Sequence, residues 1–141
     1  MLTAEATLLT TLADGYGAPL AEYYFFPDNS LLYVCWHGQL TAAEVIRGVL
    51  EGTRLNERYS FQRVLNDKRD TGGDWSEALP WLEYEWLPKA VAAGIRAIAY
   101  ILSPNLDAQI VSREFVEDVR SQIHVSLFTT EEDARDWLQT N

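Results

Sequence analysis

The residues best suited to chemistry lie in one short polar stretch, which directly follows an apolar run. Residues 67–74 read DKRDTGGD and supply three carboxylates, two cations and one hydroxyl. Paired carboxylates can transfer protons or bind a hard cation. Short aspartate side chains also hold turns and cap helices, and Asp74 stands where a helix cap is needed. We therefore interpret the stretch as a polar turn, with a structural role favoured over catalysis.

Three further residues carry reactive groups, and their spacing matches no catalytic or metal-binding motif. His37 and His124 lie far apart in the sequence and lack the closely spaced partners of a zinc site. Cys35 alternates within an apolar run, which is typical of a buried and unreactive thiol. The sequence contains no phosphate-binding or dinucleotide-binding glycine motif. It thus predicts no metal, no cofactor and no enzymatic activity, with acid/base catalysis by residues 67–74 as a weaker alternative.

A segment rich in aromatic residues follows the polar stretch and is predicted to be a helix. At about 100° per residue, four of its residues share one face and form the expected core stripe: Leu79, Leu82, Trp86 and Ala90. Trp81, Tyr84 and Pro88 fall on the opposite side. Pro88 lacks an amide proton, so we expect a kink near Tyr84. A helix that is apolar on two sides is either enclosed by the fold or presents a surface patch, and both interpretations stay open.

The elements that must position these residues alternate between strands and helices. Two apolar runs, 22–26 and 31–36, flank the turn residues 27–30 and predict an antiparallel hairpin. Thr41 and Glu44 form a capping box that opens a helix. Further strands are predicted at 61–66, 95–102 and 124–128, and further helices near 112–121 and after Thr130.

The resulting order, β-β-α-β-α-β-α-β-α, predicts an α/β fold. We expect a mixed, mainly parallel five-stranded sheet, whose antiparallel edge strand comes from the N-terminal hairpin. Residues 1–20 are expected to form an N-terminal extension or an extra edge strand, and residues 21–141 a single domain. Ligands of such sheets lie beyond the carboxyl ends of the parallel strands, which brings His37, residues 67–74 and residues 103–105 into one region.

Amino-acid composition excludes some classes of binding partner and some cellular locations. The 141 residues carry a formal net charge of −10, which repels the phosphates of nucleic acids. No apolar run reaches the roughly 20 residues of a membrane span, and the N-terminus lacks the pattern of a signal peptide. With a single cysteine, no intramolecular disulfide can form. These features predict a cytoplasmic protein of bacterial type that binds no nucleic acid.

The order of elements resembles the STAS-like fold of anti-sigma-factor antagonists and of the STAS domains of sulfate transporters. The tripeptide Trp36-His37-Gly38, the helix led by Thr41 and the ending FTTEEDARDWL are similar to the SpoIIAA-like branch of that superfamily. Anti-sigma-factor antagonists carry an Asp-Ser-(Ser/Thr)-Gly motif with a phosphorylated serine, which Asp70-Thr71-Gly72 matches only in part. The resemblance thus implies Thr71 as the one possible phosphoacceptor. The SpoIIAA-like branch is similar in shape to lipid-binding CRAL-TRIO domains. The resemblance therefore implies protein partners or small apolar ligands.

The sequence and its resemblance to the STAS-like superfamily lead to two expected functions. The first is a non-enzymatic STAS-like regulatory or protein-interaction module, which binds a protein partner or itself as a homodimer. The residues expected to make this interaction are Asp70, Thr71, Asp74, Trp75, Trp81 and Tyr84. The alternative is a carrier or sensor of a small apolar or lipid-like ligand, held between the aromatic helix and the sheet with Trp75 and Trp86 as walls.

Overall fold

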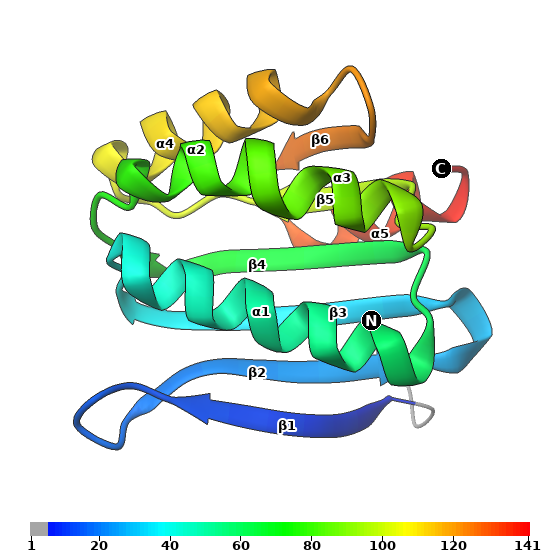
Figure 1. The fold of residues 1–141 in the computed structure, drawn as a ribbon, viewed down its shortest axis with the longest axis horizontal. Coiled ribbons are helices and arrows are strands. Elements are labelled where there is room, and N and C mark those ends of the chain that lie inside the picture. Colours follow the sequence, from blue (N-terminus) through cyan, green and yellow to red (C-terminus); the bar gives the residue numbers. More distant parts are fainter. Residues whose placement is uncertain (1–5) are drawn as a thin grey trace.

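One six-stranded sheet forms the hydrogen-bonded framework of the protein (Figure 1). The computed structural model describes residues 6–141. The strands, in chain order, are β1 (Thr7–Ala13), β2 (Pro19–Phe26), β3 (Leu31–Gln39), β4 (Arg63–Gly72), β5 (Ala97–Ile101) and β6 (His124–Phe128). They lie side by side in the order β1-β2-β3-β4-β5-β6, so each strand pairs with its neighbours in the sequence.

Strand direction divides the sheet into two halves. β1, β2 and β3 pair antiparallel, whereas β3, β4, β5 and β6 run parallel. Each parallel pair needs a crossover connection, which helices provide. The predicted α/β fold with a mixed sheet is confirmed, but the sheet has six strands and not five. The additional strand, β1, lies at the edge with most of its side chains exposed. It falls within residues 1–20, where an extra edge strand is one of the two alternatives that the sequence leaves open.

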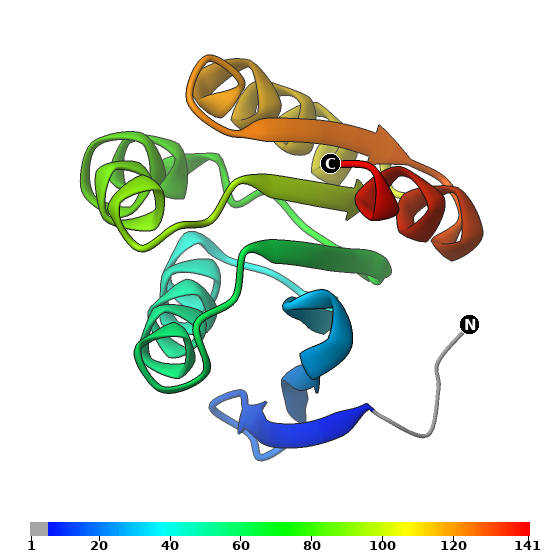
Figure 2. The same ribbon diagram turned by 90° about the vertical axis from the view of Figure 1, so that its right-hand side faces the viewer.

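Helices cover the two faces of the sheet unequally (Figure 2). They are α1 (Ala42–Tyr59), α2 (Leu79–Trp81), α3 (Leu87–Ala92), α4 (Leu106–Val119) and α5 (Glu131–Gln139), with the π-helical turn η3 (Leu82–Trp86) between α2 and α3 and the 3-10 turns η1 (Pro27–Asn29) and η2 (Ser76–Ala78). We call residues 79–92 the aromatic segment. α1, the aromatic segment and α4 lie on one face, whereas α5 lies on the other. Within residues 6–141, no helix is long and apolar enough to cross a membrane.

Two apolar cores follow from this arrangement. The larger core lies under α1, the aromatic segment and α4, and it includes Trp36, Trp75 and Tyr100. The smaller core lies under α5 and includes Tyr33 and Leu65. Successive side chains of a strand point to opposite faces, which is why Tyr33 and Trp36 of the same strand enter different cores.

Local signals set the ends of the helices. Thr41 opens α1 with the predicted capping box, and Thr130 caps α5. In contrast, α4 begins at Leu106 and not near Ser112 as predicted. The Asn105 side chain accepts a hydrogen bond (3.0 Å) from an amide of the first turn of α4. This cap starts the helix earlier because it satisfies an amide that has no partner within the helix.

The aromatic segment contains a π-helical turn where the sequence predicts a kink. In η3 the amide of Leu87 donates to the carbonyl oxygen of Leu82. Pro88 has no amide proton to donate to the carbonyl oxygen of Tyr84, so regular α-helical bonding cannot pass through this point. π-helical turns are frequent at functional sites, and this one borders the groove described below.

The main correction concerns residues 67–74, which are not a turn. β4 continues to Gly72 and remains paired with β3 along this length. Polar side chains do not end the strand because they find partners beside it, as Asp67 does with Arg69 and Tyr33. The prediction that the strand ends at Asn66 is therefore wrong, since it rests on apolar character alone.

Candidate functional site

A bulge in β4 organises the residues of the candidate site. The step from Cys35 to His37 on β3 spans two residues, whereas the step between their partners on β4, Asp67 and Asp70, spans three. An extra residue of this kind bends a strand and re-aims its side chains. Regular alternation points Asp67 to the side of the sheet that α5 covers and Lys68 into the larger core. The bulge then returns Asp70 to the α5 side, opposite His37.

Lys68 is buried in a cage of aromatic rings. Only 3% of its surface is exposed. Its Nζ atom lies 4.1 Å from the ring centroid of Trp75, 4.6 Å from that of Trp36 and 5.4 Å from that of Tyr100. No described residue accepts a hydrogen bond from the amine or forms an ion pair with it. Lysine is almost never fully buried without a partner, and a perturbed buried amine in a cleft marks a candidate functional site.

Two effects of opposite sign act on the Lys68 amine. Burial removes the water that stabilises the charged form and lowers the pKa of Lys68 to about 7. Attraction to the ring faces favours the charged form by about 0.5–2 kcal/mol for each contact. The amine can therefore exchange a proton near neutral pH, and it can pair with an anionic or hydrogen-bond-accepting group that enters the cage.

The cage opens into a groove between α1 and the aromatic segment, which we call the helix groove. A hollow of about 40 Å³ lies beside Lys68 and is lined by Trp75 and Trp86 among others. A second hollow of about 80 Å³ extends between α1 and α3 and shares Trp36 and Trp86 with the first. Typical ligand pockets measure about 300–1,000 Å³. The helix groove thus fits a small ligand as it stands, and a larger one only if the helices separate.

Hydrogen bonds and close packing fix the walls of the helix groove. Trp36 Nε1 donates to Asn66 Oδ1 at 2.9 Å. The Tyr23 hydroxyl donates to the carbonyl oxygen of Gly48 at 2.6 Å and ties α1 to β2. A side chain at position 48 would overlap with the Trp36 ring, so glycine is needed for this close approach. Trp86, which is half-buried, packs on α4 and forms the opposite wall.

Tyr100 supplies a second polar atom without a partner beside Lys68. Its hydroxyl is buried and makes no hydrogen bond with any residue in the described part of the chain. Ser112 lies close by on α4; its hydroxyl donates to the carbonyl oxygen of Ala108 at 2.9 Å, and its oxygen can still accept from Tyr100. Burial raises the pKa of Tyr100, so its hydroxyl stays protonated. Lys68 and Tyr100 therefore offer two donors at the inner end of the helix groove.

On the opposite face of the sheet, His37 joins two carboxylates. Its Nδ1 atom lies 2.7 Å from Asp70 Oδ2, and its Nε2 atom lies 2.8 Å from Glu22 Oε1. Partial burial lowers the pKa of His37, but hydrogen bonds with the two carboxylates outweigh this effect and hold the pKa above its ordinary value. Cys35 lies beside this group, and burial together with the charges of Asp67 and Glu22 raises the pKa of its thiol to about 11.

Asp67 forms a clamp between three elements. Its carboxylate accepts hydrogen bonds from the Tyr33 hydroxyl at 2.7 Å and from Arg69 Nη2 at 2.6 Å. Burial raises the pKa of Asp67, but these hydrogen bonds outweigh it and hold the pKa below its ordinary value. Arg69 also reaches Glu131 of α5 at 3.3 Å. The clamp is structural, because all of its charged groups are paired with one another.

The structure brings His37 to Asp70, and Ser103 to Thr71, as the ends of the parallel strands predict. It separates Asp70, Thr71 and Asp74 from one another. Asp70 is exposed on the α5 side of the sheet. Thr71 is buried, and its hydroxyl donates to the carbonyl oxygen of Lys68 at 2.7 Å. Asp74 is exposed and accepts a hydrogen bond from the amide of Ser76 at 2.9 Å. These residues therefore do not converge on a common point.

Two of the predicted aromatic residues lie in the helix groove, and the other two lie outside it. Trp75 and Trp86 come together in the lining of the helix groove. Trp81 is half-buried against the larger core. Tyr84 exposes 70% of its surface on the outer side of the aromatic segment.

The other residues of the two sites cannot be recognised as functional from sequence patterns alone. Lys68 stands among charged neighbours and looks like a surface lysine unless β4 is known to continue beyond Asn66. Tyr100 lies within a continuous apolar strand, where its hydroxyl is easily overlooked. Glu22 meets His37 only across the ladder between β2 and β3. One usable signal is strand alternation, which places Cys35 and His37 on the same face because they lie two residues apart.

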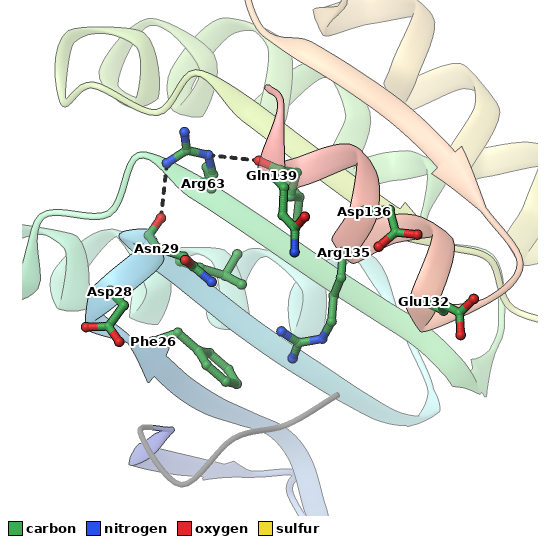
Figure 3. A pocket seen from close by; sticks show the side chains of 10 residues that line it. Phe26, Asp28, Asn29, Arg63, Glu132, Arg135, Asp136 and Gln139 are labelled. Atoms are coloured by element: carbon green, nitrogen blue, oxygen red, sulfur yellow. Dashed lines mark hydrogen bonds between the residues drawn. The ribbon is translucent and has the colours of Figure 1, made fainter.

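A surface hollow larger than those of the helix groove lies away from both sites, beside α5 (Figure 3). Its volume is about 500 Å³. Arg63 donates to the carbonyl oxygens of Asn29 at 3.0 Å and Leu138 at 3.1 Å. Arg135 lies over the ring of Phe26, with 4.7 Å between the guanidinium carbon and the ring centroid. Arg63 is engaged in holding α5 to the sheet, whereas the buried Nη2 atom of Arg135 has no hydrogen-bond partner in the described part of the chain. We consider this hollow a weaker candidate than the helix groove because most of its lining residues are polar.

Two groups of side chains within residues 6–141 have a geometry that could hold a metal ion. They are Glu22, Cys35 and His37 in the sheet, and Glu132, Asp133 and Asp136 on α5. The second group consists of exposed carboxylates in the first two turns of a helix, where acidic residues also stabilise the helix dipole. Only the first group combines different donor types in a partly buried setting.

In comparisons with known proteins, no family model, no curated protein and no solved structure matches the chain. The resemblance to the STAS-like superfamily therefore stays a prediction, and function is inferred from the geometry of the sites.

Proposed function

We propose that the protein binds a small amphipathic ligand in the helix groove and acts as its carrier or sensor. The observation that supports this proposal is the buried Lys68 amine, which has no partner among the described residues and lies at the inner end of an apolar groove. The apolar body of the ligand would pack between Trp75 and Trp86. Its polar head would accept hydrogen bonds from Lys68 and Tyr100.

The energetic argument favours a ligand with an anionic head. A buried polar group without a partner costs about 1–3 kcal/mol in mutational data. A carboxylate in the cage would supply the missing counter-ion of Lys68 and relieve this cost. At about 1.4 kcal/mol for each factor of ten, the preference for a carboxylate over an uncharged head of the same length is about 5- to 150-fold.

The same geometry limits the size of the ligand. The two hollows accept only a short chain or a single ring unless α1 and the aromatic segment move apart. The aromatic segment is the element best able to move, because η3 interrupts its regular hydrogen bonding. Such a movement would also displace the exposed ring of Tyr84.

Protein interaction, including a homodimer, stays a second proposal and is supported by the exposure of Tyr84. Tyrosine rings are enriched at protein interfaces because they bury a large area with few rotatable bonds. A ligand that shifts the aromatic segment would change the surface around Tyr84. The two proposals are therefore compatible in a sensor that reports ligand binding to a partner.

The test of the proposed function is a titration with decanoate and, in parallel, with decanol, read by tryptophan emission. Three of the five tryptophans, Trp36, Trp75 and Trp86, line the helix groove. We expect saturable quenching with decanoate, at lower concentration than with decanol. Lys68→Met should remove the preference for decanoate. Arg113→Met, which removes an exposed cation of α4 that does not line the groove, should keep it.

Two results would contradict the proposed function. One is the absence of any saturable change with either compound, together with a native mass spectrum that shows no added mass. The other is an unchanged preference for decanoate in Lys68→Met, which would mean that the head group lies elsewhere.

A further inference from the structure

A second cluster of chemistry-bearing side chains lies on the face of the sheet opposite the helix groove. Glu22 on β2 pairs directly with Cys35 on β3, and His37 lies two residues further along β3. All three side chains are partly buried. One ligand atom from each, a carboxylate oxygen, the thiol sulfur and an imidazole nitrogen, lies within 4.8 Å of the others. The ladder between β2 and β3 fixes the backbone beneath them.

His37 is already oriented as a metal ligand would be. Asp70 Oδ2 lies 2.7 Å from Nδ1 of His37 and fixes the ring, so that Nε2 faces Glu22. Histidines that bind metals almost always make such a bond to a carboxylate or carbonyl through their other nitrogen. The bulge in β4 creates this contact, because it brings Asp70 opposite His37.

From this arrangement we propose that Glu22, Cys35 and His37 bind one divalent transition-metal ion, with Asp70 as the residue that positions His37. Three protein ligands of mixed type leave a fourth position open for water, as in zinc sites that have three protein ligands. A thiolate and an imidazole favour Zn²⁺ or Co²⁺ over Mg²⁺ and Ca²⁺, which prefer oxygen ligands.

Binding of the ion requires only a small rearrangement. Bonds of about 2.0–2.1 Å at a tetrahedral angle place a nitrogen and an oxygen ligand about 3.3 Å apart. His37 Nε2 and Glu22 Oε1 are now 2.8 Å apart and share a proton. The ion replaces that proton and the proton of the Cys35 thiol, and the two side chains separate by about half an ångström.

The surroundings of the cluster favour a cation. Glu22 and Asp70 bring two carboxylates to His37, and the net charge of the protein is −10. The nearest guanidinium, that of Arg69, is engaged with Asp67 and Glu131. This inference does not depend on the proposed ligand groove, because the two sites lie on different faces of the sheet.

The test is a titration of the metal-free protein with Co²⁺, read by absorption spectroscopy. Cys35 is the only cysteine of the sequence, so a thiolate-to-cobalt charge-transfer band in the near ultraviolet can arise only from this residue. We expect one equivalent of Co²⁺ to produce the band and one equivalent of Zn²⁺ to abolish it. Cys35→Ser should remove the band, and Glu22→Gln should weaken binding.

Matched variants separate this site from adventitious binding. His37→Ala should lower the affinity for Co²⁺ at least about tenfold, whereas His124→Ala, which alters the other histidine, should leave it unchanged. Asp70→Asn should lower the affinity about 10- to 100-fold, because the histidine loses the group that orients it. Asp136→Asn, which alters the exposed carboxylates of α5, should leave the affinity for Co²⁺ unchanged. Circular dichroism spectra verify that each variant is folded.

Three results would overturn the inference. The first is the absence of a charge-transfer band in the folded protein. The second is a band that is equally strong in His37→Ala. The third is cobalt binding that Asp136→Asn removes and Cys35→Ser does not, which would assign the ion to exposed carboxylates of α5.

Discussion

Replacing Lys68 by methionine should stabilise the protein, and the gain should depend on pH. Methionine has a similar length and no charge, so Lys68→Met keeps most of the packing against Trp36, Trp75 and Tyr100. It removes the buried amine, whose pKa burial lowers from an ordinary 10.5 to about 7. The difference in free energy of unfolding between the two proteins therefore measures the destabilisation caused by burying this amine.

The magnitude follows from the difference between the two pKa values. At about 1.36 kcal/mol for each pH unit, the change from 10.5 to about 7 corresponds to roughly 5 kcal/mol at low pH. Ring contacts worth about 0.5–2 kcal/mol each offset part of this penalty. With three contacts the offset is at least about 1.5 kcal/mol, so we expect Lys68→Met to raise the free energy of unfolding at pH 6 by up to about 3.5 kcal/mol.

The sign of the pH dependence follows from proton binding. Between about pH 7 and pH 10.5 the unfolded chain binds one proton at Lys68 that the folded protein does not bind. The stability of the unaltered protein therefore rises with pH across this window. Below the window the full penalty is present, and above it the penalty disappears. The advantage of Lys68→Met should accordingly shrink as the pH rises.

Urea unfolding of both proteins at pH 6, 8 and 10, followed by circular dichroism, is the suitable assay. Groups that titrate elsewhere affect both proteins alike, so their contributions cancel in the difference. Lys89→Met serves as the control, since Lys89 is exposed and its loss should give a small difference that does not vary with pH. The reasoning is refuted if Lys68→Met destabilises the protein equally at all three pH values, because the amine would then be hydrated and unperturbed.

Three further predictions test the fold around the two sites. Gly48→Ala should lower the urea midpoint of unfolding, because the added methyl group would overlap with the fixed Trp36 ring. The overlap costs about 1–3 kcal/mol and outweighs the gain in helix propensity of about 1 kcal/mol. An unchanged midpoint would mean that the Trp36 ring can move. Asp67→Asn should lower the free energy of unfolding at pH 7 by about 2–3 kcal/mol, because Arg69 loses the buried carboxylate with which it forms an ion pair. This difference should shrink as the pH falls through the depressed pKa of Asp67, and a constant difference would contradict the pairing. Tyr84→Ser should weaken self-association in sedimentation velocity runs, and an unchanged sedimentation profile would count against a homodimer through the aromatic segment.

Much of the fold was predictable because it depends on local signals. The capping box at Thr41 and the cap at Thr130 locate two helices, and the continuous apolar run of β5 identifies a central strand. Features that depend on partners distant in the sequence were not predictable. β4 extends through residues 67–72 only because β3 and neighbouring side chains satisfy its polar groups.

The candidate sites illustrate the same limit. Trp75 and Trp86 are predicted as walls of a pocket because large aromatic side chains stand out in the sequence. Lys68 is not predicted, because it lies beyond the expected strand end at Asn66, in a part of β4 that only the pairing with β3 reveals. The contact of His37 with Glu22 and Asp70 likewise joins three strands. A sequence read one element at a time cannot show such contacts.

The most direct test of the central claim is an NMR titration of the Lys68 side chain with pH, in the free protein and in the presence of saturating decanoate. The chain has only two lysines, Lys68 and Lys89, so assignment is simple. We predict a midpoint for Lys68 at least about two pH units below its ordinary value in the free protein, and a midpoint that rises when decanoate binds because the carboxylate stabilises the ammonium. A midpoint at the ordinary value in both samples would contradict the proposed site.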